Sequence, residues 1–191
     1  MKNFTSIKDI SEKSNETKKT ALNEGFENLE LHPNLQSNLK ELGFVKMTPI
    51  QKLSLPKIMA GNDGIAKAKT GSGKTAAFGL GLLNKLDVKK FRIQSLTLCP
   101  TRELADQVAE EIRTLGRRIH NIKVTTLCGG SAFGPQKGSL EHGAHIVVGT
   151  PGRIEEHLRK KNLLLEHLDT FALDEADRML DMGFEESIAE I

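Results

Sequence analysis

Five short apolar runs recur along the chain with helical patterns between them, and this alternation restricts the chain to one class of fold. The runs cover residues 64–68, 95–99, 124–128, 145–149 and 170–174. Strands that alternate with helices through short links pair in parallel, because each crossover returns the chain to the same end of the sheet. The pattern therefore predicts an α/β fold in three layers, with a mainly parallel sheet flanked by helices.

The segments between these runs carry helix signals. One helix is predicted from Pro33 to a stop at Gly43, since proline favours the first turn and glycine the position after the last. Another begins at Thr48. The clearest helical pattern spans residues 101–119, where one stripe holds the apolar side chains of Leu104, Val108, Ile112, Leu115 and Ile119.

Parallel sheets of this kind bind ligands at the carboxyl ends of their strands. The unusual residues of this chain follow Ala68, Cys99, Cys128, Gly149 and Leu173, which is the last apolar residue of the fifth run. We therefore expect these segments to lie at one edge of the sheet and to form the functional site.

Length and charge limit the remaining choices. The chain has 191 residues, which suits one domain of ordinary size. Residues 1–20 are rich in Lys, Ser, Thr, Asn and Glu and are predicted to be a flexible polar tail, which leaves 21–191 as the folded domain. The net charge of +2 is too small to argue nucleic-acid binding from bulk electrostatics. Any such binding must come from local sites.

The cysteines and histidines point to no metal site. Cys99 and Cys128 match no zinc or redox spacing, so buried reduced thiols are expected. His142 and His145 have no carboxylate–histidine pattern around them. Since no secretory segment and no apolar run of membrane-spanning length is present, we expect a cytoplasmic protein with no membrane partner.

Residues 68–75, AKTGSGKT, have the features of a phosphate-binding loop. Gly71 and Gly73 allow the backbone to curl so that its N–H groups face an anion at the positive end of a helix dipole. Lys74 is expected to reach the β and γ phosphates, and the Thr75 hydroxyl to bind Mg²⁺. A glycine-rich turn without a ligand is the alternative. The residues expected to contact the nucleotide here are Ala68, Lys69, Thr70, Gly71, Ser72, Gly73, Lys74 and Thr75.

Three acidic residues follow the last apolar run. Asp174, Glu175 and Asp177 repel one another and resist burial, so a cation opposite them would resolve the conflict. A phosphate-loop nucleotidase needs such a carboxylate to hold Mg²⁺, and we assign this role to Asp174 together with Thr75. Glu175 is expected to orient or deprotonate the attacking water, with Lys74 and Asp174 as the other catalytic residues. An acidic helix N-terminus is the alternative.

Several short motifs of this chain occur together, in the same order, in one known protein family. Residues 174–177 read DEAD, and the chain resembles the DEAD-box RNA helicases, whose amino-terminal motifs occur here in order. The phosphate loop matches, and TPIQ at 48–51 is similar to the adenine-reading Q motif, with Phe26 at the expected 17 positions before Gly43. The resemblance covers roughly residues 26–186 and implies a RecA-like domain, an ATP-dependent RNA helicase as the parent protein, and ATP and Mg²⁺ as cofactors.

The Q-motif residues allow two interpretations. Thr48 at the N-cap, Pro49 at the first helical position and Gln51 at the third form a capping box. The Gln51 amide could instead donate to and accept from an adenine edge. Spacing favours capping, and the resemblance favours adenine recognition by Phe26, Thr48 and Gln51. Both can hold if the amide turns outward.

The resemblance also implies three RNA-contacting segments. Each has a plain alternative: Arg102 with Glu103 as a surface pair, the glycine pair as a turn, and Thr150 with Arg153 as a helix cap and its exposed neighbour. Contacts of this kind grip sugar and phosphate, so binding should be insensitive to base identity. The expected RNA-binding residues are Pro100, Thr101, Arg102, Gly129, Gly130, Thr150, Pro151, Gly152 and Arg153.

The chain departs from the family where it stops, at Ile191. The family continues with a Ser-Ala-Thr segment and a second RecA-like domain, which supplies arginines worth about 10³–10⁵ in rate in related nucleotidases. The resemblance implies that Asp177 couples to groups on those further parts. We therefore expect this chain alone to bind ATP–Mg²⁺ and RNA weakly and to hydrolyse almost nothing.

The partner and the competing functions follow from the same resemblance. Four segments are most similar to a bacterial branch that acts on ribosomal RNA, so ribosomal RNA and large-subunit assembly are the expected target and process. Two alternatives stay open: a non-enzymatic nucleotide-binding fragment, and a phosphate-loop ATPase that acts on DNA. The choice of RNA over DNA rests on the resemblance, because no residue pattern here reads a 2′-hydroxyl directly.

Overall fold

The computed structural model describes residues 25–191. The predicted polar tail, 1–20, lies outside the described residues, and its boundary stays a prediction. The chain divides into two compact units. The first holds the described residues up to Asn84 together with Leu115–Arg118, and the second holds Lys85–Thr114 and Ile119–Ile191.

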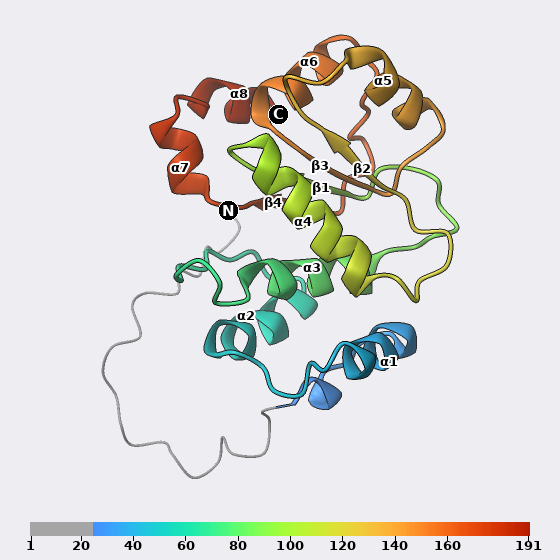
Figure 1. The fold of residues 1–191 in the computed structure, drawn as a ribbon, viewed down its shortest axis with the longest axis vertical. Coiled ribbons are helices and arrows are strands. Elements are labelled where there is room, and N and C mark those ends of the chain that lie inside the picture. The colour runs from blue at the N-terminus through green and yellow to red at the C-terminus, as the bar shows by residue number, and fades with distance from the viewer. Residues whose placement is uncertain (1–24) are drawn as a thin grey trace. The chain divides into compact units, whose positions relative to one another are not determined.

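The first unit is helical. It contains the short 3-10 turn η1 (Phe26–Asn28) and the helices α1 (Pro33–Glu41), α2 (Pro49–Met59) and α3 (Lys74–Lys85), drawn in blue to green in Figure 1. Its core is made of fully buried leucines, Leu35, Leu39, Leu55, Leu80 and Leu83. The predicted stop of α1 is confirmed, because Gly43 has φ +76° and the Phe44 N–H donates to the Leu39 carbonyl at 2.9 Å.

Residues 115–118 are attached to α1 by polar contacts. The Asn38 side chain donates to the Leu115 carbonyl at 2.7 Å in a buried position. Glu41 is ion-paired with both Arg117 and Arg118, and these cations hold the pKa of its carboxyl below the usual range. The turn that follows α4 (Arg102–Leu115) is therefore fixed to the first unit.

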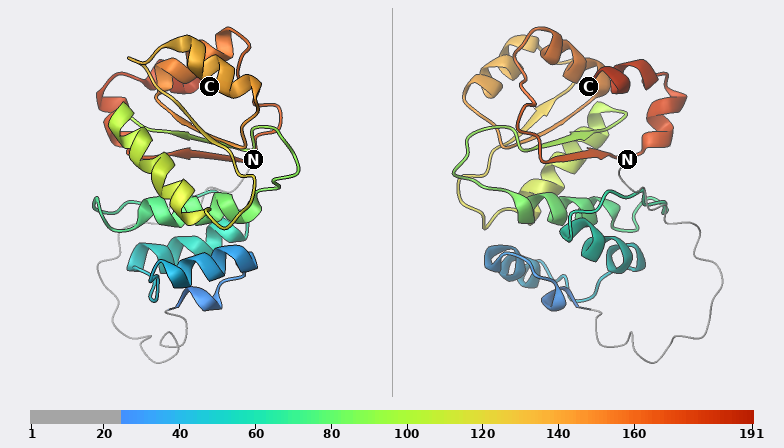
Figure 2. Two further views of the ribbon diagram at one scale, coloured as in Figure 1. Left: turned by 45° about the vertical axis from the view of Figure 1, so that its right-hand side comes forward. Right: turned by 180° about the vertical axis from the view of Figure 1, so that it is seen from behind.

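The second unit is built on a parallel sheet of β1 (Ser95–Leu98), β2 (Val124–Leu127), β3 (Ile146–Gly149) and β4 (Thr170–Leu173), in the order β2-β3-β1-β4. The helices are α4, α5 (Phe133–Glu141), α6 (Pro151–Arg159), α7 (Ala176–Asp181) and α8 (Glu185–Glu190). Figure 2 shows helices on both faces of this sheet, with α4 on one face and α5 and α6 on the other. The predicted parallel sheet flanked by helices is confirmed.

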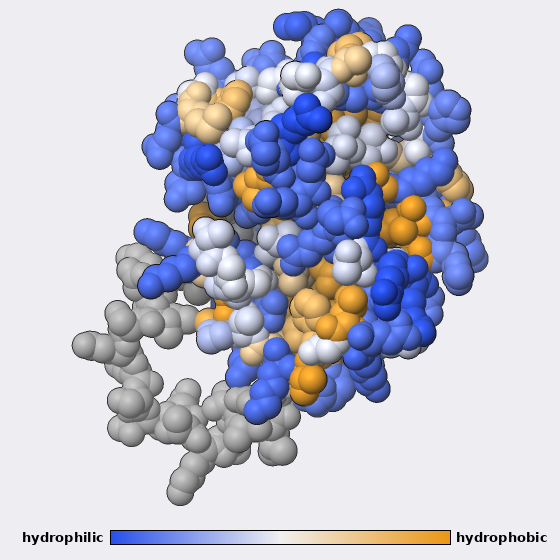
Figure 3. Space-filling view, in the orientation of Figure 1, coloured by the Kyte–Doolittle hydropathy of each residue, from blue (hydrophilic) through white to orange (hydrophobic). Residues whose placement is uncertain are grey.

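One face of the sheet carries a continuous apolar core. Leu96, Leu98, Leu127 and Val147 point from the strands toward Ile154 of α6 and Met179 of α7, and all are almost fully buried. The burial of such side chains supplies roughly 1.5–3 kcal/mol each. On the face of the molecule shown in Figure 3, hydrophobic residues form small patches separated by hydrophilic ones.

Two predicted elements are corrected. Residues 64–68 do not form a strand: only Ile65 has a single bridge assignment, and its side chain is 59% exposed. The run contains Gly64 and two alanines, which have low strand propensity. The helix predicted over 101–119 ends at Leu115, because Gly116 disfavours helix and the next two arginines turn toward Glu41, so Ile119 lies beyond it.

The prediction for the cysteines is confirmed, since Cys99 and Cys128 are both free and buried. Burial raises the pKa of the Cys128 thiol to about 11, and it raises that of Cys99 further with help from the nearby Asp174 charge. Over residues 25–191, no helix is long and apolar enough to cross a bilayer.

Candidate functional site

The predicted phosphate loop is folded around the side chain of Lys74, in the first unit. The Lys74 Nζ donates to the carbonyl oxygens of Ala68 at 2.6 Å and Lys69 at 3.0 Å. Gly71 and Gly73 adopt φ of +78° and +88°, a conformation that costs other residues about 1 kcal/mol or more. These glycines turn the chain into α3, whose first residue is Lys74.

The loop fits an anionic ligand. An ammonium group lies at the start of a 12-residue helix, where the first-turn N–H groups have no partner within the helix. The Ser72 hydroxyl oxygen is buried and has no hydrogen-bond partner among the described residues. In this structure the Lys74 ammonium donates to the carbonyl oxygens of Ala68 and Lys69. A phosphate oxygen, which is charged, would be a stronger acceptor for it.

The TPIQ segment contacts the same loop. Gln51 is 3% exposed, and its Nε2 donates to the Gly73 carbonyl at 3.1 Å. The capping box is present, since the Thr48 N–H donates to Gln51 Oε1 at 2.8 Å and the Gln51 N–H donates to Thr48 Oγ1 at 3.4 Å. A Cβ at position 73 would lie 3.1 Å from Gln51 Cδ and 3.3 Å from Thr48 Oγ1. Gln51 thus joins the cap of α2 to the phosphate loop, and its recognition of adenine stays a prediction.

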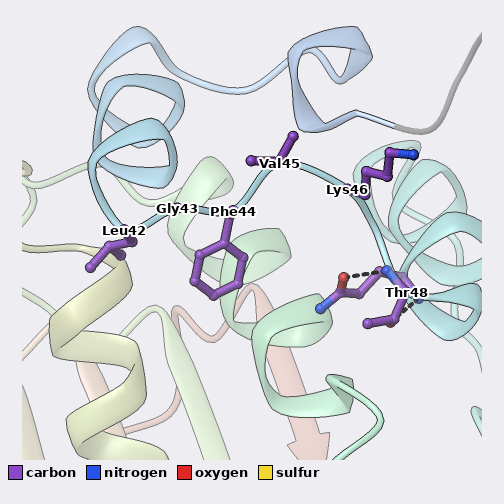
Figure 4. Close-up of a pocket in the computed structure, with 7 residues that line it drawn as sticks. Leu42, Gly43, Phe44, Val45, Lys46 and Thr48 are labelled. Carbon is purple, nitrogen blue, oxygen red and sulfur yellow. Dashed lines mark hydrogen bonds between the residues drawn. The ribbon is translucent and has the colours of Figure 1, made fainter.

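An open groove of about 550 Å³ lies beside Gln51. Figure 4 shows that its lining runs along the segment between α1 and α2. The lining residues are Leu42, Gly43, Phe44, Val45, Lys46, Thr48 and Gln51. Sequence reasoning missed Phe44 and Val45, although an apolar pair directly after a helix-ending glycine is a signal for packing there. Val45 is 71% exposed and is available to a flat ligand.

Phe26 is buried, whereas an aromatic side chain that binds a base would have to be exposed. It is 3% exposed, and its ring packs edge-on against Phe44, with centroids 5.7 Å apart and planes at 74°. It does not line the groove described above. In this structure Phe26 packs against Phe44, and its predicted contact with a base stays a prediction.

Substitution of Gln51 by glutamate is expected to weaken ATP binding about 5- to 150-fold. The carboxylate can still accept from the Thr48 N–H, so the cap persists, but it cannot donate to an adenine edge as the adenine interpretation requires, and a lost buried hydrogen bond costs about 1–3 kcal/mol. Calorimetric titration with ATP–Mg²⁺ measures the change. Gln36→Glu, which alters a similar side-chain contact to the Leu29 carbonyl, is the matched control and should leave affinity unchanged. Equal ATP affinities for the Gln51 variant and the unaltered chain would contradict a role for Gln51 in nucleotide binding.

The acidic residues lie at the carboxyl end of β4, in the second unit. Asp174 is 7% exposed, and its N–H donates to the Leu98 carbonyl at 3.0 Å. Burial, with a further contribution from the Asp174 charge, raises the pKa of Glu111. A buried carboxylate suits a hard cation such as Mg²⁺, which takes oxygen ligands. Thr75 belongs to the other unit, and its pairing with Asp174 at one ion remains a prediction.

Glu175 has an unusual backbone. Its φ of 53° and ψ of 49° place it in the left-handed region, which costs a non-glycine residue about 1–3 kcal/mol and is enriched at functional sites. Its Oε2 accepts from Arg178 Nη1 at 3.1 Å. The strained backbone and this contact fix the direction of the carboxylate that we assigned to the attacking water.

The segments predicted to contact RNA line one edge of the sheet. The strand order places the ends of β2, β3, β1 and β4 next to one another, so 129–130, 150–153, 100–102 and 174–175 follow in that sequence. The common edge is therefore confirmed for four of the five expected segments. The fifth, after Ala68, belongs to the other unit.

Two of these segments are bonded to each other. Thr150 is the N-cap residue of α6, and its carbonyl accepts from the Ile154 N–H at 3.1 Å, so the cap position is confirmed. Its hydroxyl does not cap the helix and instead accepts from the Gly129 N–H at 3.3 Å. Arg153 Nη1 and Nη2 both donate to the Ser131 carbonyl at 3.1 Å, and its Nε pairs with Glu156 at 3.1 Å. Since the Arg153 side chain is only 11% exposed, the interpretation as an exposed neighbour is wrong. Arg153 joins the two segments.

The remaining predicted RNA contacts differ in exposure: Gly129, Gly130 and Gly152 are exposed, whereas Pro100 and Pro151 are buried. The Arg102 side chain is 54% exposed and is ion-paired with Asp106 at 3.7 Å, in place of the alternative pair with Glu103. Thr101 Oγ1 accepts from the Leu104 N–H at 3.3 Å at the start of α4. A Cβ at Gly129 would meet nothing within 4 Å, so the fold itself leaves that space open.

Three comparisons relate this chain to known proteins. A family model described as DEAD/DEAH box helicase matches residues 48–191. The chain is 56% identical to the ATP-dependent RNA helicase DbpA of Escherichia coli K12 over 167 residues, which is 87% of the chain and 36% of that protein. It is 46% identical to the DEAD-box ATP-dependent RNA helicase CshA of Streptococcus pneumoniae serotype 4, covering 87% of the chain and 32% of that protein. The chain thus spans about a third of these relatives.

A solved structure shares the fold. The crystal structure of a DEAD box protein from the hyperthermophile Methanococcus jannaschii matches with a TM-score of 0.83 and 41% identity, over 87% of this chain and 46% of that one. The RecA-like fold class predicted from the sequence is therefore confirmed.

Proposed function

Because the chain belongs to the DEAD/DEAH box helicase family, we propose that it is the ATP-binding portion of an ATP-dependent RNA helicase. The observation that supports this most directly is the edge of the parallel sheet, where the acids after β4 and the three segments predicted to contact RNA follow neighbouring strands. Acids suited to a nucleotide's Mg²⁺, beside residues suited to sugar and phosphate, are what a motor that uses ATP to act on nucleic acid requires. RNA is proposed as the polymer from the names of the relatives.

In the proposed mechanism the phosphate loop and Lys74 bind the triphosphate. Lys74 leaves the Ala68 and Lys69 carbonyls for phosphate oxygens, where it offsets charge that develops as the γ-phosphoryl group transfers. Thr75 and Asp174 would hold Mg²⁺, which supplies further charge neutralisation when bound. Glu175 orients the attacking water and accepts its proton.

The RNA backbone is proposed to lie along the edge formed by 100–102, 129–130 and 150–153. Exposed Arg102 offers a guanidinium to a phosphate, and the open space at Gly129 lets the chain come close to the protein backbone. The resemblance of several segments to a bacterial branch that acts on ribosomal RNA makes ribosomal RNA the proposed target and large-subunit assembly the proposed process. A cytoplasmic location is proposed on the same ground.

Measurements of RNA binding and of ATP hydrolysis by this chain test the proposal. Labelled single-stranded RNA is titrated with the chain, Mg²⁺ and a non-hydrolysable ATP analogue, with unlabelled RNA or DNA of the same sequence as competitor. We expect weak, salt-sensitive binding that is insensitive to base order, displacement by RNA in preference to DNA, and ATP turnover close to background.

Each other outcome supports a different function. Equal displacement by DNA would favour a phosphate-loop ATPase that acts on DNA. ATP binding with no affinity for either polymer would favour a nucleotide-binding fragment. Robust RNA-stimulated turnover by residues 1–191 alone would contradict the expectation that these residues do not supply the transition-state arginines.

A further inference from the structure

His157 of α6 is a buried imidazole that the proposed function does not use. It is fully buried, and neither ring nitrogen has a hydrogen-bond partner among residues 25–191. A buried polar group without a hydrogen-bond partner is unfavourable, so the retention of this imidazole calls for a physical reason. Its ring instead stacks on Phe133, with centroids 4.2 Å apart and planes at 11°.

A second buried histidine shows that the fold can satisfy an imidazole where hydrogen bonds are wanted. His145 is also fully buried, but its Nδ1 accepts from the Lys123 N–H at 3.1 Å and its Nε2 lies 3.2 Å from the Val88 carbonyl. Its contact with Phe91 is looser and tilted, at 4.9 Å and 49°. His157 thus differs in using its flat face in place of its nitrogens.

The stack joins the two helices that follow the predicted RNA segments. Phe133 is the first residue of α5 and comes directly after the glycine loop 129–132, while His157 lies on α6, one turn beyond Arg153. Lys160 Nζ lies 4.0 Å from the centroid of the Phe133 ring, and the Arg153 guanidinium lies 5.6 Å from it. Burial and the Arg153 charge lower the pKa of His157, which favours a neutral ring in the stack.

We propose that Phe133 is a positioning residue for nucleic-acid binding: by stacking on His157 it locks α5 to α6 and holds 129–132 and 150–153 as one preformed surface. This inference rests on the proposed RNA-binding role of those segments. Two kinds of polar contact also join them, Gly129 to Thr150 and Arg153 to the Ser131 carbonyl. Because the stacked ring fixes the two helices, segments 129–132 and 150–153 are already ordered, and RNA binding does not have to supply the entropic cost of ordering them.

The test compares Phe133→Leu with Phe133→Tyr in the full chain. Leucine keeps an apolar side chain without a flat ring, whereas tyrosine keeps the ring. We expect Phe133→Leu to weaken RNA binding about five- to tenfold, with ATP affinity unchanged, and Phe133→Tyr to restore it. Phe133→Met repeats the leucine test with a side chain that adapts to irregular space. Phe91→Leu, which alters the other phenylalanine–histidine contact, should leave RNA binding unchanged.

Nuclear magnetic resonance of the histidine rings supplies a readout specific to the stack. The His157 ring protons should move downfield in Phe133→Leu and Phe133→Met, because the ring current of Phe133 is lost, and should stay in place in Phe133→Tyr. Full RNA affinity in variants with shifted His157 signals would overturn the positioning role. No RNA binding by the unaltered chain would instead contradict the proposed function, and with it this inference.

Discussion

Replacement of Lys74 by alanine is expected to weaken ATP–Mg²⁺ binding by about 100-fold or more. The Lys74 ammonium is the cation around which the loop closes, and in this structure it already donates to two loop carbonyls. Alanine removes both the charge that faces the phosphates and the two contacts that hold the loop. In the proposed complex the ammonium donates to oxygens of the β and γ phosphates. Charge-assisted hydrogen bonds contribute about 1.5–3 kcal/mol each, so the loss of these two corresponds to at least about a hundredfold in affinity.

A nearby lysine provides the matched control. Lys67 lies just before the loop and is exposed, so Lys67→Ala removes the same charge without opening the loop. Isothermal titration calorimetry with ATP–Mg²⁺ should show near-normal affinity for Lys67→Ala and little or no heat for Lys74→Ala. Undiminished affinity in Lys74→Ala would contradict the assignment of residues 68–75 as the phosphate site.

Gly149→Ala is expected to lower the free energy of unfolding by about 3 kcal/mol, at the upper end of overpacking effects. Gly149 ends β3 in the middle of the sheet, and a Cβ there would lie 2.8 Å from Ile154 Cδ1 and closer still to the Leu127 carbonyl oxygen. The carbonyl is part of the neighbouring strand and accepts from the Thr150 N–H, so it cannot move without disturbing the ladder. Denaturant unfolding measures the change.

Gly152→Ala is the control for this substitution. A Cβ at Gly152 would meet nothing within 4 Å, and alanine suits the first turn of α6 better than glycine does. We expect its unfolding free energy to stay within about 0.5 kcal/mol of the unaltered chain, as for most surface changes. A Gly149→Ala chain as stable as this control would show that the strand and helix ends adjust more freely than the contacts suggest.

The fold could be predicted where burial follows a regular pattern. The runs at 95–99, 124–128 and 145–149 are apolar over the length of a strand, and each became one within a residue of its expected bounds. The run at 64–68 has one large apolar residue, Ile65, which stays 59% exposed, and it forms no strand. Exposure alone does not decide this, because β4 is a strand although Phe171 and Leu173 are 45% and 40% exposed; β4 pairs with β1 along its whole length. A sequence pattern does not report which neighbouring strand is available for pairing.

The site was predictable in its residue types and not in its partners. Spacing along the chain identified Lys74, Thr48 and Gln51, because a loop and a cap are local structures. It could not show that Arg153 bonds to Ser131, since these residues are 22 positions apart and come together only through the sheet. The left-handed backbone of Glu175 likewise had no signal, because such strain is imposed by its surroundings.

The bond from the Gln51 amide to the Gly73 carbonyl has a wider consequence. If an adenine draws the amide toward itself, the phosphate loop loses a donor, and if the triphosphate reshapes the loop, the amide is freed for the base. By thermodynamic reciprocity each event then favours the other. A nucleotide with another base would lose binding free energy at its base and also at its triphosphate, so selectivity for the base would affect binding of the whole ligand.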